Sequence, residues 1–312
     1  MGNTFYFEFE PILMQWFQGV LGEKGALVLS QFSALGEEFI ILLVMGFLYW
    51  CYDKKIGIYV ATNALIGTTL NPMIKNVFLR RRPYMVHDGV KCFRPVDKSA
   101  DIYDIAAQGY SFPSGHSTNS VVVYGSVAKF LRNKVLTILA FVLPLLVGIS
   151  RVAVGVHYPT DVICGWLSGV LVVFFIPFIY EKAGEEKRPL LNLIVFAVSA
   201  VGFFYCRTTD YFTAMGLMGG FFLAIEFEKR FVNFEETRRP VEIVLRIVGG
   251  FAVYLVLNTL LKLPFSKYFL QSDTMGSFMV RFIRYMIVSF VMMGVYPVLF
   301  KVFEKSRLAQ KI

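Results

Sequence analysis

Long apolar runs separated by polar stretches, most of them short, dominate the chain from residue 35 to residue 300. A helix needs about 20 apolar residues to cross the hydrocarbon core of a bilayer, which is about 30 Å thick. The runs that approach this length cover residues 35–50, 56–79, 116–131, 135–150, 160–180, 190–206, 211–227, 241–261 and 277–300. This pattern predicts an all-α fold, a polytopic transmembrane helical bundle of about nine spans. We expect the first six spans to form a core and the last three to extend it.

Before the first run, apolar residues recur at helical spacing in the N-terminal segment. They are Ile12, Leu13, Trp16, Phe17, Val20 and Leu21. Such a stripe is typical of a helix that lies in the membrane interface, and equally of a helix packed against the rest of the protein. The segment lacks a basic stretch followed by a short apolar core and a small-residue cleavage site, so we do not expect a removable signal peptide.

No linker, low-complexity tract or repeat divides the chain. We therefore expect three parts that follow the apolar pattern. Residues 1–34 form an N-terminal interfacial segment, residues 35–206 form the membrane core, and residues 207–312 supply additional C-terminal transmembrane helices.

The distribution of charge gives the predicted bundle an orientation. The chain is 56% hydrophobic and has a mean hydropathy of +0.59, yet its formal net charge is +9. In a membrane protein, basic residues in the loops beside spans have a topological meaning, so we expect no nucleic acid partner. When the loops are assigned alternately to two sides, one side receives sixteen basic residues: Lys54, Lys55, Lys129, Arg132, Lys134, Lys182, Lys187, Arg188, Lys229, Arg230, Arg238, Arg239, Lys301, Lys305, Arg307 and Lys311. That side should be cytoplasmic, in a multi-pass protein of the cell membrane.

Three polar clusters interrupt the apolar sequence on the opposite side of the predicted bundle. They are Lys75-x6-Arg82-Pro83, Pro113-Ser114-Gly115-His116 and Ser150-Arg151-x5-His157-x3-Asp161. Together they supply cations, histidines, a carboxylate and a Ser-Gly pair before a predicted helix. A phosphate ester must be held as an anion and stabilised as charge spreads over its oxygens in the transition state, and these groups suit that task. The clusters therefore predict phosphate chemistry.

The basic residues of the first and third clusters can neutralise phosphate oxygens. Arg82 and Arg151 offer planar forks that match two oxygens each, whereas Lys75 acts as a compact point charge. Arg80 and Arg81 fall outside the motif spacing. Their position beside a span end favours a topological role, with side chains that reach the membrane interface.

The second and third clusters contain the groups that can orient and attack the phosphate. The N–H groups of Ser114, Gly115 and His116 precede an apolar helical run and can point at an anion. His157 and Asp161 are four residues apart, which places them on one helical face. The carboxylate can accept the proton of one imidazole nitrogen and leave the other nitrogen free to attack phosphorus.

The order and spacing of these clusters resemble the three-part motif of the type 2 phosphatidic acid phosphatase family, which also includes vanadium haloperoxidases and bacterial acid phosphatases. All positions of the motif are filled. The resemblance implies an integral membrane phosphatase that hydrolyses a lipid phosphate or diphosphate monoester through a phosphohistidine. It implies that His157 is the nucleophile, that Asp161 orients it, and that His116 protonates the leaving oxygen and then serves as base. The phosphate-binding residues implied are Lys75, Arg82, Ser114, Gly115 and Arg151.

We expect no metal and no cofactor. The four cysteines, Cys51, Cys92, Cys164 and Cys206, contain no C-x-x-C pair. No EF-hand, H-E-x-x-H or two-carboxylate pattern accompanies the motif, so the predicted reaction is metal-independent. His87 lies in the loop between the first two clusters and outside the predicted mechanism.

Other functions fit part of the pattern. A haloperoxidase would hold vanadate in the same site, but those relatives are soluble. A phosphotransferase that uses an acceptor other than water shares every named residue. A lipid transporter or lipid-binding protein with the same ancestry should carry a damaged motif, whereas this motif is intact. Candidate substrates are undecaprenyl diphosphate, phosphatidic acid, phosphatidylglycerol phosphate and sphingoid phosphates, since the motif recognises the phosphate and not the tail. The sequence does not indicate an oligomeric state.

Overall fold

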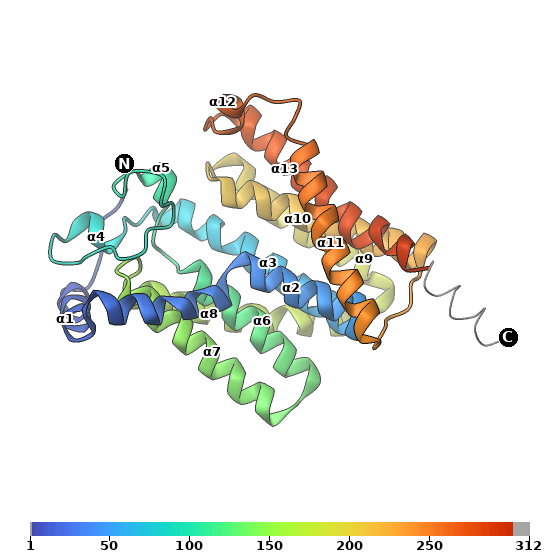
Figure 1. Cartoon of the computed structure of the whole chain (residues 1–312), viewed down its shortest axis with the longest axis horizontal. Coiled ribbons are helices and arrows are strands. Elements are labelled where there is room, and N and C mark those ends of the chain that lie inside the picture. The colour runs from blue at the N-terminus through green and yellow to red at the C-terminus, as the bar shows by residue number, and fades with distance from the viewer. Residues whose placement is uncertain (1, 302–312) are drawn as a thin grey trace. The chain divides into compact units, whose positions relative to one another are not determined.

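The computed structural model describes residues 2–301 and is all-helical, as the apolar runs predicted (Figure 1). The longer helices are α1 (Phe9–Ser30), α2 (Glu38–Phe47), α3 (Lys54–Phe78), α6 (Gly115–Leu131), α7 (Lys134–Ala153), α8 (Pro159–Ala183), α9 (Arg188–Ala200), α10 (Thr209–Phe227), α11 (Pro240–Leu260) and α13 (Met275–Phe290). Single helical turns form α4 (Pro83–Val86), α5 (Ile105–Gln108) and α12 (Lys267–Leu270). A 3₁₀ segment, Gln31–Gly36, follows α1. Among residues 2–301 the β contacts are limited to an isolated bridge between Asn3 and Arg80.

The described residues divide into two compact units, each discontinuous in sequence. Residues 2–41 and 70–178 form the first unit, and residues 42–69 and 179–301 form the second. Helix α3 contributes to both units, because the division falls at residue 70. The sequence division into residues 1–34, 35–206 and 207–312 follows the apolar pattern and not this packing, and it stays a prediction. Lys305, Arg307 and Lys311 of the charge pattern lie outside the described residues.

Five helical stretches are long and apolar enough to cross a membrane: Lys134–Ala153, Pro159–Ala183, Glu185–Phe204, Pro240–Leu260 and Met275–Leu299. A sixth span is added if Phe9–Gly36 and Glu38–Tyr52, which meet at a bend, cross as one broken helix. The other expected runs are helical, as α3, α6 and α10, but they do not qualify as spans. A multi-pass membrane protein is supported, whereas the number of nine spans is not confirmed.

Helices α6 and α10 do not reach the length and hydropathy of the candidate spans, and many of their side chains are buried. Helix α6 has only 17 residues, and its Ser117, Thr118 and Ser120 are buried. Helix α10 buries most of its apolar side chains between Tyr211 and Ile225. Hydropathy along a sequence does not separate side chains that face protein from side chains that face lipid. The apolar pattern therefore predicted the helices better than it predicted their exposure.

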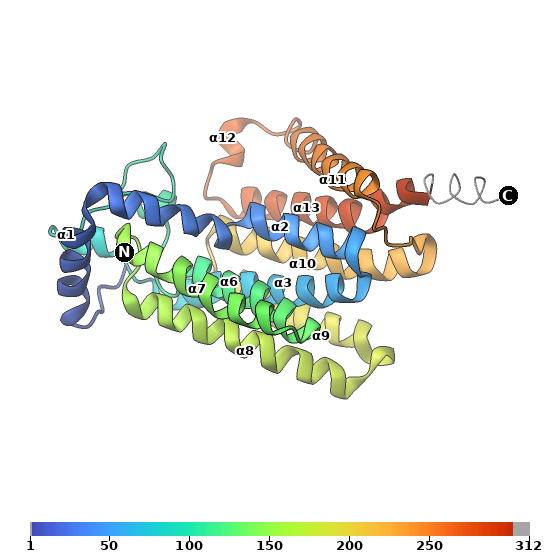
Figure 2. The ribbon, with the colours of Figure 1, turned by 60° about the horizontal axis from the view of Figure 1, so that its bottom comes forward.

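In the first unit, α6, α7 and α8 lie side by side (Figures 1 and 2). Helix α8 approaches α6 closely through two glycines. A Cβ at Gly165 would lie 2.7 Å from the carbonyl oxygen of Ser114, and a Cβ at Gly169 would lie 2.7 Å from Cβ of Val121. Small residues four apart allow helix backbones to approach in this way. Asp161, one turn before Gly165, is thereby brought beside the start of α6.

The turn between α7 and α8 depends on Gly155. Its φ is +81°, and a Cβ there would collide with the carbonyl oxygen of Lys91. Only glycine adopts this conformation at such a close approach without strain. The turn sets His157 between the end of α7 and the start of α8.

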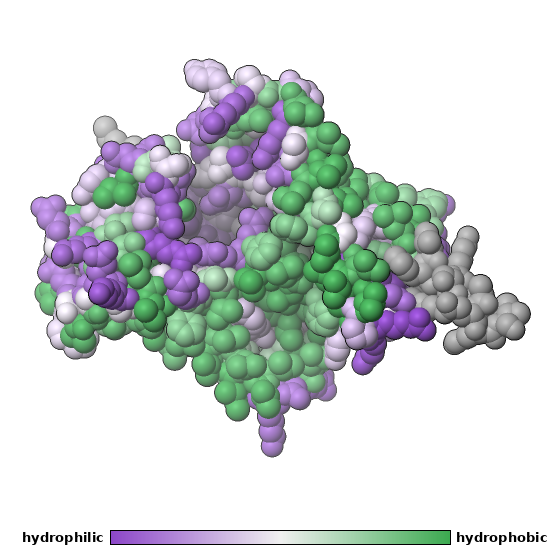
Figure 3. Space-filling model, in the orientation of Figure 1, coloured by the Kyte–Doolittle hydropathy of each residue, from purple (hydrophilic) through white to green (hydrophobic). Residues whose placement is uncertain are grey.

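The outer surface of the first unit is apolar along α7 and polar over the loops that carry α4 and α5 (Figure 3). Large apolar side chains of α7 that are exposed include Val135, Ile138, Phe141 and Leu145. Helix α1 also exposes apolar residues, among them Ile12, Trp16 and Val20, while Glu10, Met14 and Gln18 on its other side are buried. The interfacial position of this helix stays a prediction.

The second unit is built around α10 and α13. A Cβ at Gly216 or Gly220 of α10 would collide with main-chain oxygens of α13, so these helices pack backbone to backbone. Helix α11 contributes a buried arginine, Arg246, which donates hydrogen bonds to the carbonyls of Trp50 at 2.6 Å and Glu235 at 2.8 Å.

Candidate active site

The residues predicted to act on phosphate all lie in the first unit, at the ends of helices. Lys75 is in the last turn of α3, Arg151 is in the last turn of α7, and Asp161 is in the first turn of α8. The N–H of Ser114, at the start of α6, donates to the main-chain carbonyl of Asp161 at 2.9 Å. The second and third clusters are therefore joined directly.

Arg82 is buried, and main-chain carbonyls fix its guanidinium. Nε and Nη2 donate to the carbonyl of Gln108 at 2.8 and 2.6 Å, and Nη1 donates to the carbonyl of Val156 at 2.9 Å. These bonds tie the turn after α3 to the loop that carries α5 and to the turn between α7 and α8. The positive charge of Arg82 is thereby held beside His157, which follows Val156 in the chain.

Arg151 is also buried, at the end of α7. Its Nη1 donates to Oγ of Ser33 at 3.1 Å, and that oxygen lies 2.8 Å from Oγ of Ser150. Within residues 2–301, its Nε has no hydrogen-bond partner. A buried guanidinium held by neutral oxygens, with an unused donor, is a strong binding group for an anion.

His157 and Asp161 are both buried, and they face each other across the turn that begins α8. Nδ1 of His157 lies 3.5 Å from Oδ2 of Asp161. This is an ion-pair distance, longer than the hydrogen-bond range of about 2.7–3.2 Å. Oδ2 also accepts a hydrogen bond from the N–H of Tyr158 at 2.8 Å. The other imidazole nitrogen, Nε2, does not face Asp161.

The electrostatic surroundings favour a neutral imidazole at His157. Burial lowers its pKa well below the usual range, and the positive charges of Arg82, Arg151 and Lys75 lower it further. A neutral imidazole carries the lone pair that a nucleophile needs. The charges that keep His157 neutral are the same charges that the motif assigns to the phosphate.

The start of α6 is more constrained than the sequence predicted. Oγ of Ser114 accepts hydrogen bonds from the N–H and Oγ of Ser117, at 3.4 and 2.9 Å, and so caps the helix. The N–H of Ser114 is engaged by the carbonyl of Asp161. In this structure Ser114 therefore does not offer its N–H to an anion, contrary to the expectation. Gly115 and His116 supply the first N–H groups of the helix proper.

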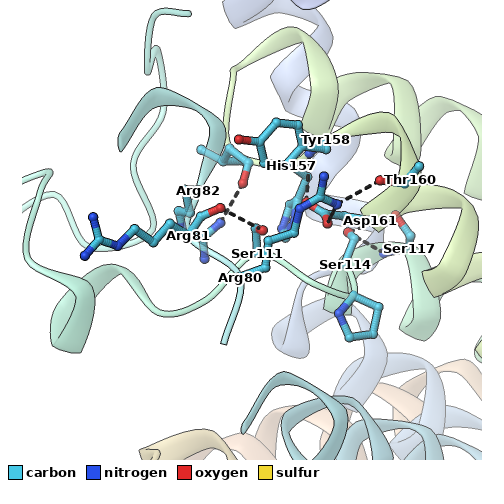
Figure 4. A network of polar contacts seen from close by, with 12 residues as sticks. Arg80, Arg81, Arg82, Ser111, Ser114, Ser117, His157, Tyr158, Thr160 and Asp161 are labelled. Atoms are coloured by element: carbon cyan, nitrogen blue, oxygen red, sulfur yellow. Dashed lines mark hydrogen bonds and ion pairs between the residues drawn. The ribbon is translucent and has the colours of Figure 1, made fainter. Parts of the chain in front are cut away.

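Arg80 is buried inside the protein, so the expectation that its side chain extends to the membrane interface is wrong. Its side chain is only 1% exposed. Nη1 donates to Oδ1 of Asp161 at 2.7 Å and to Oγ1 of Thr160 at 2.8 Å, and Nη2 donates to Oε2 of Glu10 at 2.9 Å. Figure 4 shows that Arg80 points toward Asp161, whereas the side chain of Arg81 points away from it.

Sequence reasoning also missed Glu10, which is fully buried. Its Oε1 accepts hydrogen bonds from the N–H and Oγ1 of Thr160 at 3.0 and 2.6 Å. Glu10 thus contacts both the first turn of α8 and the side chain of Arg80. The sequence did contain one signal, an acidic residue within an apolar segment. Burying such a charge costs much free energy unless the charge is paired.

The remaining histidines differ in their surroundings. His116 is half-buried at the start of α6, where a Cβ at Gly36 would lie 2.8 Å from its carbonyl oxygen. His87 packs edge-on against Tyr6 with ring centroids 4.5 Å apart, outside the predicted mechanism. Within the described part of the chain, no group of three His, Cys, Asp or Glu residues could hold a metal ion.

Comparison with known families and proteins agrees with the motif. Residues 55–185 match the PAP2 superfamily, and residues 212–311 match the transmembrane extension of PAP2 superfamily phosphatases. The chain is 34% identical over 158 residues to an undecaprenyl-diphosphatase of Sulfolobus acidocaldarius, covering 50% of this chain and 70% of that protein. It is 28% identical over 162 residues to the undecaprenyl-diphosphatase BcrC of Bacillus subtilis, covering 52% and 75%.

Other relatives act on different lipids, according to their names. A lipid A 1-phosphatase of Rhizobium etli is 31% identical over 134 residues, covering 43% of this chain and 54% of that protein. No solved structure matches the chain significantly. The family match, its transmembrane extension and the relatives named above lead to one conclusion: the chain belongs to the PAP2 superfamily and is a membrane phosphatase of that family.

Proposed function

We propose that this phosphatase hydrolyses a lipid phosphate or diphosphate monoester through a phosphohistidine formed at His157. The observation that carries the proposal is the pairing of the buried His157 with the carboxylate of Asp161; burial and the charges of three basic residues lower the pKa of this imidazole and so favour its neutral form. A nucleophile with an orienting carboxylate and a cationic binding site are the parts that phosphoryl transfer to an enzyme requires.

The phosphate is held by a phosphate cradle, which consists of the side chains of Lys75, Arg82 and Arg151 and the N–H groups of Gly115 and His116. Ser114 contributes by capping α6 and fixing the direction of those N–H groups. The fixed guanidinium of Arg82 supports this role, because a preorganised charge does not need to reorient during the reaction.

In the first step, the lone pair on Nε2 of His157 forms a bond to phosphorus as the bond from phosphorus to the ester oxygen breaks. His116 gives its proton to the leaving oxygen. The proton on Nδ1 of His157 stays in place and faces Asp161, which offsets the positive charge that develops on the ring. In the second step, His116 accepts a proton from water, which attacks phosphorus and releases inorganic phosphate and free His157.

We further propose that the site faces away from the cytoplasm, in the cell membrane. The sixteen basic residues assigned to the opposite side of the bundle support this orientation. Residues 35–206 would then carry the catalytic core, while residues 207–312 add helices beside it. The family match that starts at residue 212 supports a boundary near residue 207.

Undecaprenyl diphosphate is the first substrate to test, because two relatives that align over 70% and 75% of their length are undecaprenyl-diphosphatases. Purified protein should release phosphate from one member of a panel that also contains phosphatidic acid, phosphatidylglycerol phosphate and a sphingoid phosphate. The His157→Ala variant is the matched control. Phosphate that appears on an added alcohol instead of in solution would identify a phosphotransferase and overturn hydrolysis.

A further inference from the structure

Three buried charged side chains are joined by two ion pairs next to the proposed nucleophile. The guanidinium of Arg80 lies between the carboxylates of Asp161 and Glu10, at 2.7 and 2.9 Å. Asp161 belongs to the family motif, but Arg80 and Glu10 do not. The motif therefore accounts for only one of the three charges.

Aromatic rings cover the guanidinium of Arg80. Its central carbon lies 3.9 Å from the ring centroid of Tyr158 and 4.7 Å from that of Phe5. Such surroundings exclude water, so the two ion pairs are screened less than surface pairs. Removing one member would leave a buried charge without compensation, which is strongly unfavourable. The three residues therefore act as a unit.

The hydrogen bonds give each carboxylate oxygen of Asp161 a different task. Oδ1 accepts from Nη1 of Arg80, and Oδ2 accepts from the N–H of Tyr158. With both oxygens held, the carboxylate cannot rotate, and Oδ2 is the atom that faces Nδ1 of His157. The direction of the imidazole therefore depends on Arg80.

Glu10 fixes the other end of the arrangement. It accepts two hydrogen bonds from Thr160, in the first turn of the helix that carries Asp161, and one from Nη2 of Arg80. Arg80 and Glu10 compensate each other in charge. The negative charge of Asp161 is thus left to offset the positive charge that develops on the imidazole.

We propose that Arg80 and Glu10 are positioning residues of the phosphatase, which hold Asp161 as an ionised carboxylate aimed at Nδ1 of His157. The inference rests on the proposed phosphohistidine mechanism. Neither residue touches the phosphate, so their effect is on the rate of attack by Nε2 and not on substrate binding. The N-terminal segment thereby takes part in the reaction through Glu10.

The test measures phosphoenzyme formation in Arg80→Lys and Glu10→Gln. Arg80→Met would leave two buried carboxylates without a cation and is expected to fold poorly, so the milder variants carry the test. The matched control is Arg81→Lys, because the Arg81 side chain points away from Asp161 (Figure 4). Protein in detergent is mixed rapidly with ³²P-labelled lipid phosphate and quenched in alkali, where phosphohistidine is stable. The amount of label per protein and its rate of appearance are recorded separately, together with KM.

We expect the initial rate of phosphoenzyme formation per folded protein to be lower by about 10- to 100-fold in both variants, as for a misplaced catalytic group, and less label to accumulate because hydrolysis of the phosphohistidine is unchanged. KM should change by less than about twofold, since the phosphate cradle is intact. The rate of phosphoenzyme formation should fall less in the single variant Arg80→Lys than in the double variant that combines Arg80→Lys with Glu10→Gln. Arg81→Lys should match the wild type.

A structural role would give a different result. If the initial rate of labelling per folded protein, with the folded fraction measured by size-exclusion chromatography, equals that of the wild type, Arg80 and Glu10 only support folding, and the inference is wrong. If the wild type itself forms no phosphohistidine during turnover, the proposed mechanism fails first and the inference fails with it. These two failures are distinguished by the wild-type trace alone.

Discussion

The N–H of Ser114 donates a hydrogen bond to the main-chain carbonyl of Asp161 at 2.9 Å. This bond joins the start of α6 to the start of α8, and so joins the second motif cluster to the third. It can form because Gly165 allows the two helices to approach at this point. The geometry of the candidate site therefore depends on a glycine outside the three clusters.

Gly165→Ala should damage the site through this contact. The added Cβ would lie 2.7 Å from the carbonyl oxygen of Ser114 and force α8 away from α6. We expect a loss of about 1–3 kcal/mol in the free energy of unfolding, as for other overpacked sites, together with lower turnover. Thermal unfolding in detergent and phosphate release measure the two effects. Gly19→Ala is the control, because its Cβ meets nothing within 4 Å; an equal loss in that variant would contradict the explanation.

The pH dependence of the reaction should reflect the lowered pKa of His157. Activity requires the neutral imidazole, and burial with three nearby cations keeps it neutral below the usual imidazole pKa. As the pH falls, kcat/KM should therefore persist through about 6.5 and decline only below it. The profile is corrected with a separate titration of the substrate phosphate. A decline centred above about 6.5 would contradict the assignment of His157 as nucleophile.

Activity should survive metal chelation, because the positive charges in the proposed phosphate cradle belong to the protein. Orthovanadate should inhibit in competition with the substrate by occupying the same cradle. Phosphate release is measured with and without EDTA after gel filtration. Activity that disappears in EDTA and returns with a divalent ion would refute a metal-independent reaction.

The proposed orientation can be checked in a cysteine-free background by labelling intact cells with a membrane-impermeant maleimide. Asp88 and Lys187 are exposed residues on opposite predicted sides. Asp88→Cys should react in intact cells, and Lys187→Cys should react only after the cells are opened. Reaction of Lys187→Cys alone in intact cells would mean that the site faces the cytoplasm.

The sequence was a good guide to the helices, since apolar runs are local properties, and the spacing of the three clusters marked the residues that stay candidates for the site. It could not provide the number of spans. Helices α6 and α10 fall within apolar runs that the sequence counts as spans, yet they do not reach the length and hydropathy of the five candidate spans, and many of their residues are buried within the protein. Lipid and protein select similar side chains, so hydropathy alone does not distinguish these surroundings.

The part of the site that the sequence missed is held together over long separations. Arg80 and Glu10 are 70 residues apart, and both bind the first turn of α8, a further 80 residues along the chain. No spacing rule relates such positions. The position of Arg80 beside a span end fits a topological role when only the sequence is considered. The tertiary structure reveals that Arg80 pairs with Asp161.

The central claim concerns the roles of the two histidines in the motif. His157→Ala should abolish turnover, because no other group supplies the attacking nitrogen. The loss of turnover in His116→Ala should be smallest with substrates that have good leaving groups, because such groups need little protonation. Asp161→Asn should fold but lose much of the rate, because the imidazole is held in the wrong tautomer.

Phosphoenzyme trapping with ³²P-labelled substrate, followed by identification of the labelled residue, tests this claim most directly. Label should appear on His157 in the wild type, remain in His116→Ala with a good leaving group, and be absent from His157→Ala. Label that persists in His157→Ala and disappears in His116→Ala would contradict the account and reverse the two roles.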